Sequence, residues 1–206
     1  MHIIKLWPLN GINLSLFTKG LSDYKKAQYQ SAIMYFDSVL INERCAIAAY
    51  YYRGKAYAHL GQYKIAFDNY IKAMKIQKHQ SLWNACANIQ YKLKNYQVAL
   101  EYYNRAIAMN PKECSYYINK GDTLRKLGNY NQALEAYKHA LSLKRDCAEI
   151  YQSRGSLYLE TKAYELAICD YHTALKLNPN LNGAQQNLAK AKVQLRRLDK
   201  PKNPHI

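Results

Sequence analysis

GDTLRKLGNYNQALEAY, residues 121–137, carries a spacing that most of the chain repeats. A glycine is followed at fixed intervals by a leucine, a tyrosine, an alanine and a second aromatic residue. A fixed period of about 34 residues indicates stacked supersecondary units rather than one globular core. The tyrosines of the pattern are Tyr29, Tyr63, Tyr96, Tyr130 and Tyr164, the alanines are Ala32, Ala66, Ala99, Ala133 and Ala167, and the second aromatic residues are Phe36, Tyr70, Tyr103, Tyr137 and Tyr171.

The pattern resembles the tetratricopeptide repeat, a helix–turn–helix unit of about 34 residues. The resemblance implies an all-α fold, an α-solenoid of helix–turn–helix repeats that forms a right-handed superhelix with a C-terminal capping helix. The resemblance is supported by a small residue that recurs in the first helix of each repeat, namely Gly20, Gly54, Ala87, Gly121 and Gly155. The repeats are expected at 13–46, 47–79, 80–113, 114–147 and 148–181.

The two ends of the chain differ from the repeats. Residues 1–12 form an apolar N-terminal leader that we expect to cover the first repeat, with a membrane-surface or partner anchor, or simple disorder, as alternatives. Residues 182–198 are predicted to form the capping helix, because Ala184, Leu188 and Ala191 begin one narrow apolar stripe. Residues 199–206 contain two prolines and are predicted to be disordered.

The lack of a recognisable targeting signal, together with the cysteine usage, leads us to expect a cytoplasmic location or an equivalent reducing compartment. No apolar run reaches the ~20 residues of a transmembrane helix, and no Ala-x-Ala-like cleavage site follows the apolar run at 3–17. The cysteines number 5, and none lies within three residues of another. We expect them to be reduced thiols that pack as small apolar residues.

The sequence offers no chemistry typical of an enzyme. Its 6 histidines show no metal-ligand spacing with one another or with the cysteines. It contains neither a glycine-rich phosphate loop nor a Gly-x-Ser-x-Gly motif. We therefore predict a non-enzymatic protein with no catalytic residues, no cofactor and no metal site.

The resemblance implies that a peptide or helix of a partner protein binds in the concave groove lined by the first helices. Asparagine amides can bond to an extended peptide backbone, and tyrosine rings offer rigid contact area. Lysine and arginine at these positions favour a carboxylate-bearing ligand. A solvated polar face without a ligand is the alternative. The first-helix positions that face the groove in the family correspond to Phe17, Leu21, Tyr51, Lys55, His59, Asn84, Asn88, Tyr91, Lys92, Ile118, Asp122, Arg125, Lys126, Gln152, Ser156 and Leu159.

Chaperone-binding members of the family clamp a C-terminal carboxylate with two lysines, two asparagines and an arginine. In the best register of this sequence, Asn88 and Asn119 match the two asparagines. Asn84, Glu149 and Ser153 replace the three cations. Because a buried carboxylate would then be poorly paired, this clamp is not expected.

The predicted function is an adaptor, a co-chaperone-like protein or an assembly factor. The formal net charge of +16 is strongest in 47–79 and beyond Asn182, and it favours acidic partners. The alternative is a helical repeat protein that binds RNA or another nucleic acid through its basic surface and stacks bases on its 21 tyrosines. Weak contact with an anionic membrane surface is a further alternative. The sequence does not indicate an oligomeric state.

Overall fold

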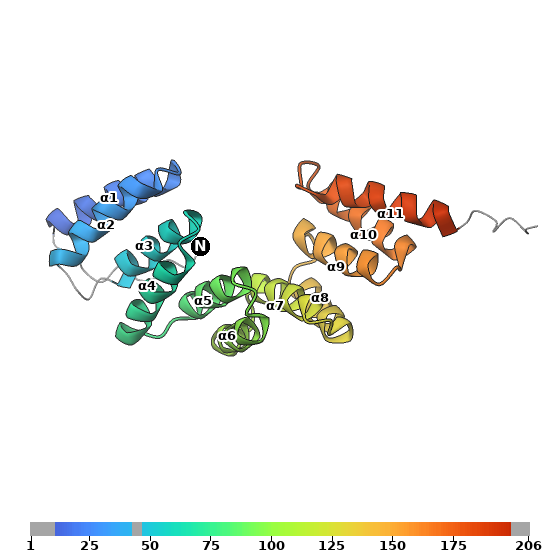
Figure 1. The fold of residues 1–206 in the computed structure, drawn as a ribbon, viewed down its shortest axis with the longest axis horizontal. Coiled ribbons are helices and arrows are strands. Elements are labelled where there is room, and N and C mark those ends of the chain that lie inside the picture. Colours follow the sequence, from blue (N-terminus) through green and yellow to red (C-terminus); the bar gives the residue numbers. More distant parts are fainter. Residues whose placement is uncertain (1–10, 43–46, 199–206) are drawn as a thin grey trace, which may run out of the picture. The chain divides into compact units, whose positions relative to one another are not determined.

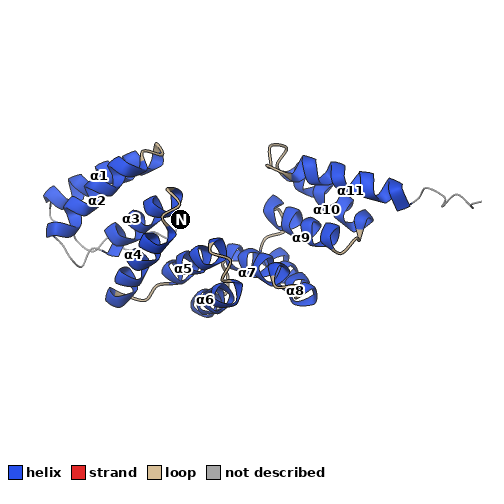
Figure 2. Cartoon of the chain, in the orientation of Figure 1, coloured by secondary structure: helices blue, strands red, loops and turns tan. Residues whose placement is uncertain are grey.

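Residues 11–42 and 47–198 are described by the computed structural model. Over these ranges the chain consists of α-helices joined by turns and short connections, with no strand (Figures 1 and 2), so the expected all-α fold is confirmed. Most of the expected leader, residues 1–10, and the expected tail, residues 199–206, lie outside the described residues. The helices are α1 Gly11–Lys25, α2 Tyr29–Asn42, α3 Ile47–His59, α4 Tyr63–Ile76, α5 Gln80–Lys92, α6 Tyr96–Met109, α7 Cys114–Lys126, α8 Tyr130–Leu143, α9 Ala148–Glu160, α10 Tyr164–Leu177 and α11 Ala184–Leu198.

The chain divides into two compact units, Met1–Pro111 and Lys112–Ile206, and each is a stack of helical hairpins. In the first unit, α1 pairs with α2, α3 with α4 and α5 with α6, while α2 contacts α3 and α4 contacts α5. In the second unit, α7 pairs with α8 and α9 with α10, and α11 packs against α10. Because one hairpin is too thin to bury its own apolar face, each depends on its neighbours for a core.

Each hairpin turns through one residue in the left-handed backbone region. Between α7 and α8 this residue is Gly128, whose φ is 78°. The N–H of Asn129 donates to the carbonyl of Leu124 at 2.9 Å, which is the bond that closes a Schellman motif. Lys94 occupies the same place between α5 and α6 with φ 64°, and Asn95 donates to Gln90 at 2.9 Å. The glycine-free turn therefore closes in the same way, at a cost of about 1 kcal/mol for a side chain in this region.

A buried aromatic ring lies against a small residue where the two helices of a hairpin cross. Tyr137 is fully buried, and a Cβ added to Gly121 would lie 2.5 Å from its ring. A Cβ added to Gly54 would lie 2.6 Å from the Tyr70 ring. The spacing between the glycine and the second aromatic residue therefore fixes how the hairpin folds. The alanines of the pattern, Ala32, Ala66, Ala99, Ala133 and Ala167, are all fully buried.

Phe17 also belongs to this core, and its predicted position in the groove was wrong. The side chain is 1% exposed, and its ring centroid lies 5.7 Å from that of Phe36 and 5.9 Å from that of Tyr52. Since Tyr52 belongs to α3, the second hairpin covers this position of α1.

The hydroxyl groups of three buried tyrosines bond back to the first helix of their own hairpin. Tyr103 donates to Asn88 Oδ1 at 2.6 Å, Tyr137 donates to Asp122 Oδ1 at 2.8 Å, and Tyr171 donates to Ser156 Oγ at 3.1 Å. Each acceptor directly follows the small residue at the helix crossing. This residue therefore satisfies a polar atom that would otherwise be costly to bury.

We predict that Gly121→Ala destabilises the protein more than Gly155→Ala does. The added methyl group at Gly121 would meet the Tyr137 ring at 2.5 Å, whereas at Gly155 the Tyr171 ring is 3.1 Å away. Tyr137 cannot move aside easily, because it is buried and bonded to Asp122. Gly121→Ala should lower the free energy of unfolding by about 1–3 kcal/mol, as overpacked cores do. At Gly155, the helix propensity of alanine, about 1 kcal/mol, should offset most of the strain. Urea denaturation of both variants measures the difference, and equal losses would contradict the ring contact as the cause.

Candidate peptide-binding site

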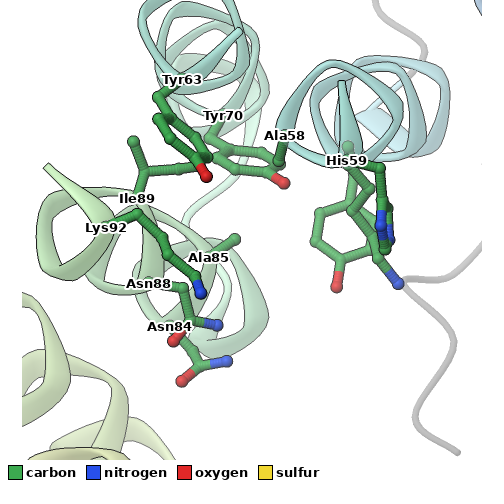
Figure 3. Close-up of a pocket in the computed structure, with 11 residues that line it drawn as sticks. Ala58, His59, Tyr63, Tyr70, Asn84, Ala85, Asn88, Ile89 and Lys92 are labelled. Carbon is green, nitrogen blue, oxygen red and sulfur yellow. The ribbon is translucent and has the colours of Figure 1, made fainter. Parts of the chain in front are cut away.

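A pocket of about 410 Å³ opens in the first unit between α3, α4 and α5. Figure 3 shows Tyr63 and Tyr70 facing the space into which Asn84, Asn88 and Lys92 extend from α5. Its volume lies in the usual range for ligand sites. The pocket is lined by Tyr51, Lys55, Ala58, His59, Tyr63, Tyr70, Asn84, Ala85, Asn88, Ile89 and Lys92.

Helical periodicity explains how these side chains meet. Residues four apart share one helix face. Six of the positions predicted for the groove line the pocket in this way: Tyr51, Lys55 and His59 from α3, and Asn84, Asn88 and Lys92 from α5. Their geometry fits a common site, and their role in binding stays a prediction.

Lys55 has the most unusual environment in the pocket. Its ammonium nitrogen lies 5.2 Å from the ring centroid of Tyr24, 5.7 Å from that of Tyr51 and 5.6 Å from that of Tyr52. Cation–π attraction holds it there. Burial lowers the pKa of Lys55. No ion pair within the described residues involves it.

His59 connects the pocket to the first hairpin. Its ring is stacked on Tyr29 with centroids 4.5 Å apart, and its Nε2 lies 2.9 Å from the hydroxyl oxygen of Tyr24. Burial lowers the pKa of His59, and the charge of Lys55 lowers it further. The neutral imidazole is therefore the form favoured at neutral pH.

The charged side chains that line the pocket are basic. Lys55 and Lys92 contribute positive charge, and no Asp or Glu is among the described side chains that line it. The asparagines add amides that can both donate and accept hydrogen bonds. This combination suits a polar ligand that carries negative charge.

Tyr91, although predicted with this group, does not line the pocket. Its ring meets that of Tyr96 edge-on with centroids 5.4 Å apart, so it packs between α5 and α6.

The predicted residues of the second unit make internal contacts in most cases. Asp122 accepts from Tyr137 and, at 3.2 Å, from the Ser153 hydroxyl, and burial raises the pKa of its carboxyl group. Arg125 forms an ion pair with Glu160 and lies 3.6 Å from Asp122.

Three further predicted residues of this unit differ from one another. Gln152 donates to the carbonyl of Asn182 at 2.6 Å and thereby ties α9 to the segment before α11. Ile118 is half-buried, and Lys126 is exposed.

Family models bear directly on what these hairpins are. Three models described as "Tetratricopeptide repeat" match residues 80–113, 102–135 and 148–181. A fourth, described as "TPR repeat", matches residues 121–162. This chain is a tetratricopeptide repeat protein. Such proteins are generally non-enzymatic scaffolds, and the repeat identifies a protein–protein interaction module.

Solved tetratricopeptide repeat structures share the fold. TTC0263, a thermophilic protein of Thermus thermophilus, superimposes with a TM-score of 0.74 at 20% identity, over 88% of this chain and 99% of that chain. MamA from Desulfovibrio magneticus RS-1 gives a TM-score of 0.73 at 18% identity, over 85% and 100%. YrrB, described as "a TPR protein with an unusual peptide-binding site", gives 0.66 at 21% identity, over 86% and 90%. A comparison with curated protein sequences finds no match.

Two arginines with structural roles were missed by sequence reasoning. Arg154 donates through Nε and Nη2 to the two carboxylate oxygens of buried Asp170, both at 2.7 Å. Arg53 donates through Nε to Asn69 Oδ1 at 2.7 Å and pairs with Asp37. Both arginines immediately precede the crossing glycine of a tetratricopeptide repeat. The shared position was a signal that could have revealed them.

The cysteines and the helices add no further chemistry within the described part of the chain. Cys86, Cys114, Cys147 and Cys169 are free thiols, whereas Cys45 lies outside the described residues. Burial raises the pKa of Cys86 to about 12, so this thiol is not activated. Among the residues that the structure describes, no group of three potential metal ligands occurs, and no helix is long and apolar enough to cross a membrane.

We predict that Arg125→Ala destabilises the fold, whereas Lys126→Ala leaves it unchanged. Loss of the guanidinium removes its pairs with Asp122 and Glu160 and leaves a mostly buried carboxylate with less compensation. The expected loss is about 2 kcal/mol, typical of a hydrogen-bonded charge. The exposed neighbour Lys126 should change stability by less than about 0.5 kcal/mol. Thermal and urea unfolding measure both. Equal stability of the two variants would show that Arg125 does not support the fold.

Proposed function

We propose that this protein binds a segment of a partner protein in the pocket between α3, α4 and α5, as a non-enzymatic adaptor or assembly factor. The observation that carries the proposal is the convergence of Lys55, Asn84 and Lys92 on one pocket without a carboxylate among its described lining residues. Groups of this kind can bond to an extended backbone and to an acidic side chain. Binding, rather than turnover, is then the mechanism.

The rest of the fold supports such a role. The turns and crossing residues fix how each hairpin folds, and a preformed pocket would reduce the ordering entropy that opposes binding. YrrB, which shares the fold, is described as having a peptide-binding site, and peptide binding by this chain is consistent with that likeness. The charge of +16 would speed the approach of an acidic partner.

Peptide selection on the intact protein tests the proposal. Peptides chosen from a random display library on the full chain are synthesised, and their affinities are measured by calorimetry. We predict that the double variant Asn84→Ala/Lys92→Ala binds them at least about tenfold more weakly, because it loses a backbone-binding amide and a cation. The control is Lys64→Ala/Lys72→Ala, which removes two positive charges from exposed positions of α4, one more than the pocket variant loses. Equal affinity of wild type and the pocket variant would exclude this pocket as the site.

Nucleic acid is tested on the same preparation. Single-stranded RNA should not be retarded in a gel at micromolar protein and physiological salt. Retardation that survives this salt concentration would instead favour the nucleic-acid alternative, since unspecific phosphate binding weakens steeply with ionic strength.

A further inference from the structure

The second hairpin departs from the other tyrosine hairpins at one position. The residue after the small crossing residue is Asn88, Asp122 or Ser156 in three hairpins, and each accepts a hydrogen bond from its tyrosine. In the second hairpin this residue is Lys55, which has no acceptor atom. The partner tyrosine, Tyr70, has no such acceptor among the described residues, and it lines the pocket.

The Lys55 ammonium and the Tyr70 hydroxyl therefore belong to one pocket, the first without an ion-pair partner and the second without an acceptor among the described residues. The ammonium of Lys55 is half-buried among three tyrosine rings and forms no ion pair within the described part of the chain. A cation held partly out of water is stabilised strongly by an anion that reaches it. The Tyr70 hydroxyl is a donor that an anionic oxygen accepts well.

From this arrangement we propose that the pocket holds the carboxylate of an Asp or Glu side chain in the bound peptide. The ammonium of Lys55 pairs with the carboxylate, and the Tyr70 hydroxyl donates to it. The amides of Asn84 and Asn88, which extend from α5 (Figure 3), bond to the peptide backbone on either side. This inference rests on the proposed function, and it names the side chain that the partner presents.

A carboxylate suits the pocket better than a phosphate does. The described lining contains no arginine, whose planar fork matches phosphate. The lysines and asparagines that line it lie on α3 and α5 beyond the first turn of each helix, whereas phosphate is commonly bound by backbone N–H groups at a helix N-terminus.

The test combines a change in the peptide with a change in the protein. Peptides selected on the wild type should be enriched in Asp or Glu. Replacing the acidic residue of a selected peptide by its amide should weaken binding about tenfold. Lys55→Met keeps the apolar stem and removes the charge. We predict that this variant binds the acidic peptide about tenfold more weakly than wild type does. It should also bind the acidic and amide peptides with equal affinity. The control is Lys72→Met, at an exposed position of α4, which should bind both peptides as wild type does.

The outcomes separate this inference from the proposed function. Suppose that binding depends on Asn84 and Lys92 but not on Lys55 or on the acidic residue. The proposal that the pocket binds an Asp or Glu carboxylate is then overturned, while the pocket remains a peptide-binding site. If none of these changes matters, or if no peptide is selected, both fail. If Lys55→Met does not fold, as judged by circular dichroism, the acid-to-amide change on the wild type alone decides. Tighter binding of a phosphoserine peptide than of the glutamate peptide, lost in Lys55→Met, would overturn the carboxylate in favour of phosphate.

Discussion

A buried aromatic ring against a residue with little or no side chain is the contact on which each hairpin depends. At Gly121 and Gly54 there is no room even for a methyl group, because Tyr137 and Tyr70 fill the space where the helices cross. The contact brings the two backbones close, and the fully buried alanine of the second helix allows the same approach from the other side. The turn must then have one fixed length, which is why a lysine accepts the left-handed conformation where glycine is absent.

The residue beside that crossing has two uses along the same chain. In most of the tyrosine hairpins it accepts the tyrosine hydroxyl and belongs to the fold, as Asp122 does. In the second hairpin it is Lys55, and the hydroxyl acceptor is exchanged for a half-buried cation. The first hairpin fits the same logic, because its aromatic residue, Phe36, has no hydroxyl that needs an acceptor. One position on one helix face can therefore serve stability in one repeat and recognition in another.

These two uses explain how far the sequence could predict the molecule. The recurring spacing predicted the helical hairpins through its resemblance to the tetratricopeptide repeat. The resemblance also implied that Tyr51, Lys55 and Asn84 share a groove, and all three line one pocket. It did not reveal that Arg125 pairs with Glu160, 35 residues away, or that Tyr52 of α3 covers Phe17. Those contacts depend on how one hairpin lies against the next, which periodicity within a repeat does not specify.

The same distinction changes the meaning of the large positive charge. Arg53, Arg125 and Arg154 each pair with a carboxylate of another helix, through a planar group that can bond to several acceptors at once. Their charges hold helices together and are largely unavailable to a partner. Lys55 has rings around it instead of a carboxylate. Cation–π attraction is weaker than an ion pair in a partly buried site, so this lysine retains the capacity to bind an anion. A count of basic residues treats these three arginines and Lys55 alike. Their local partners distinguish them, because Lys55, which lines the pocket, is not paired with a carboxylate of the described residues.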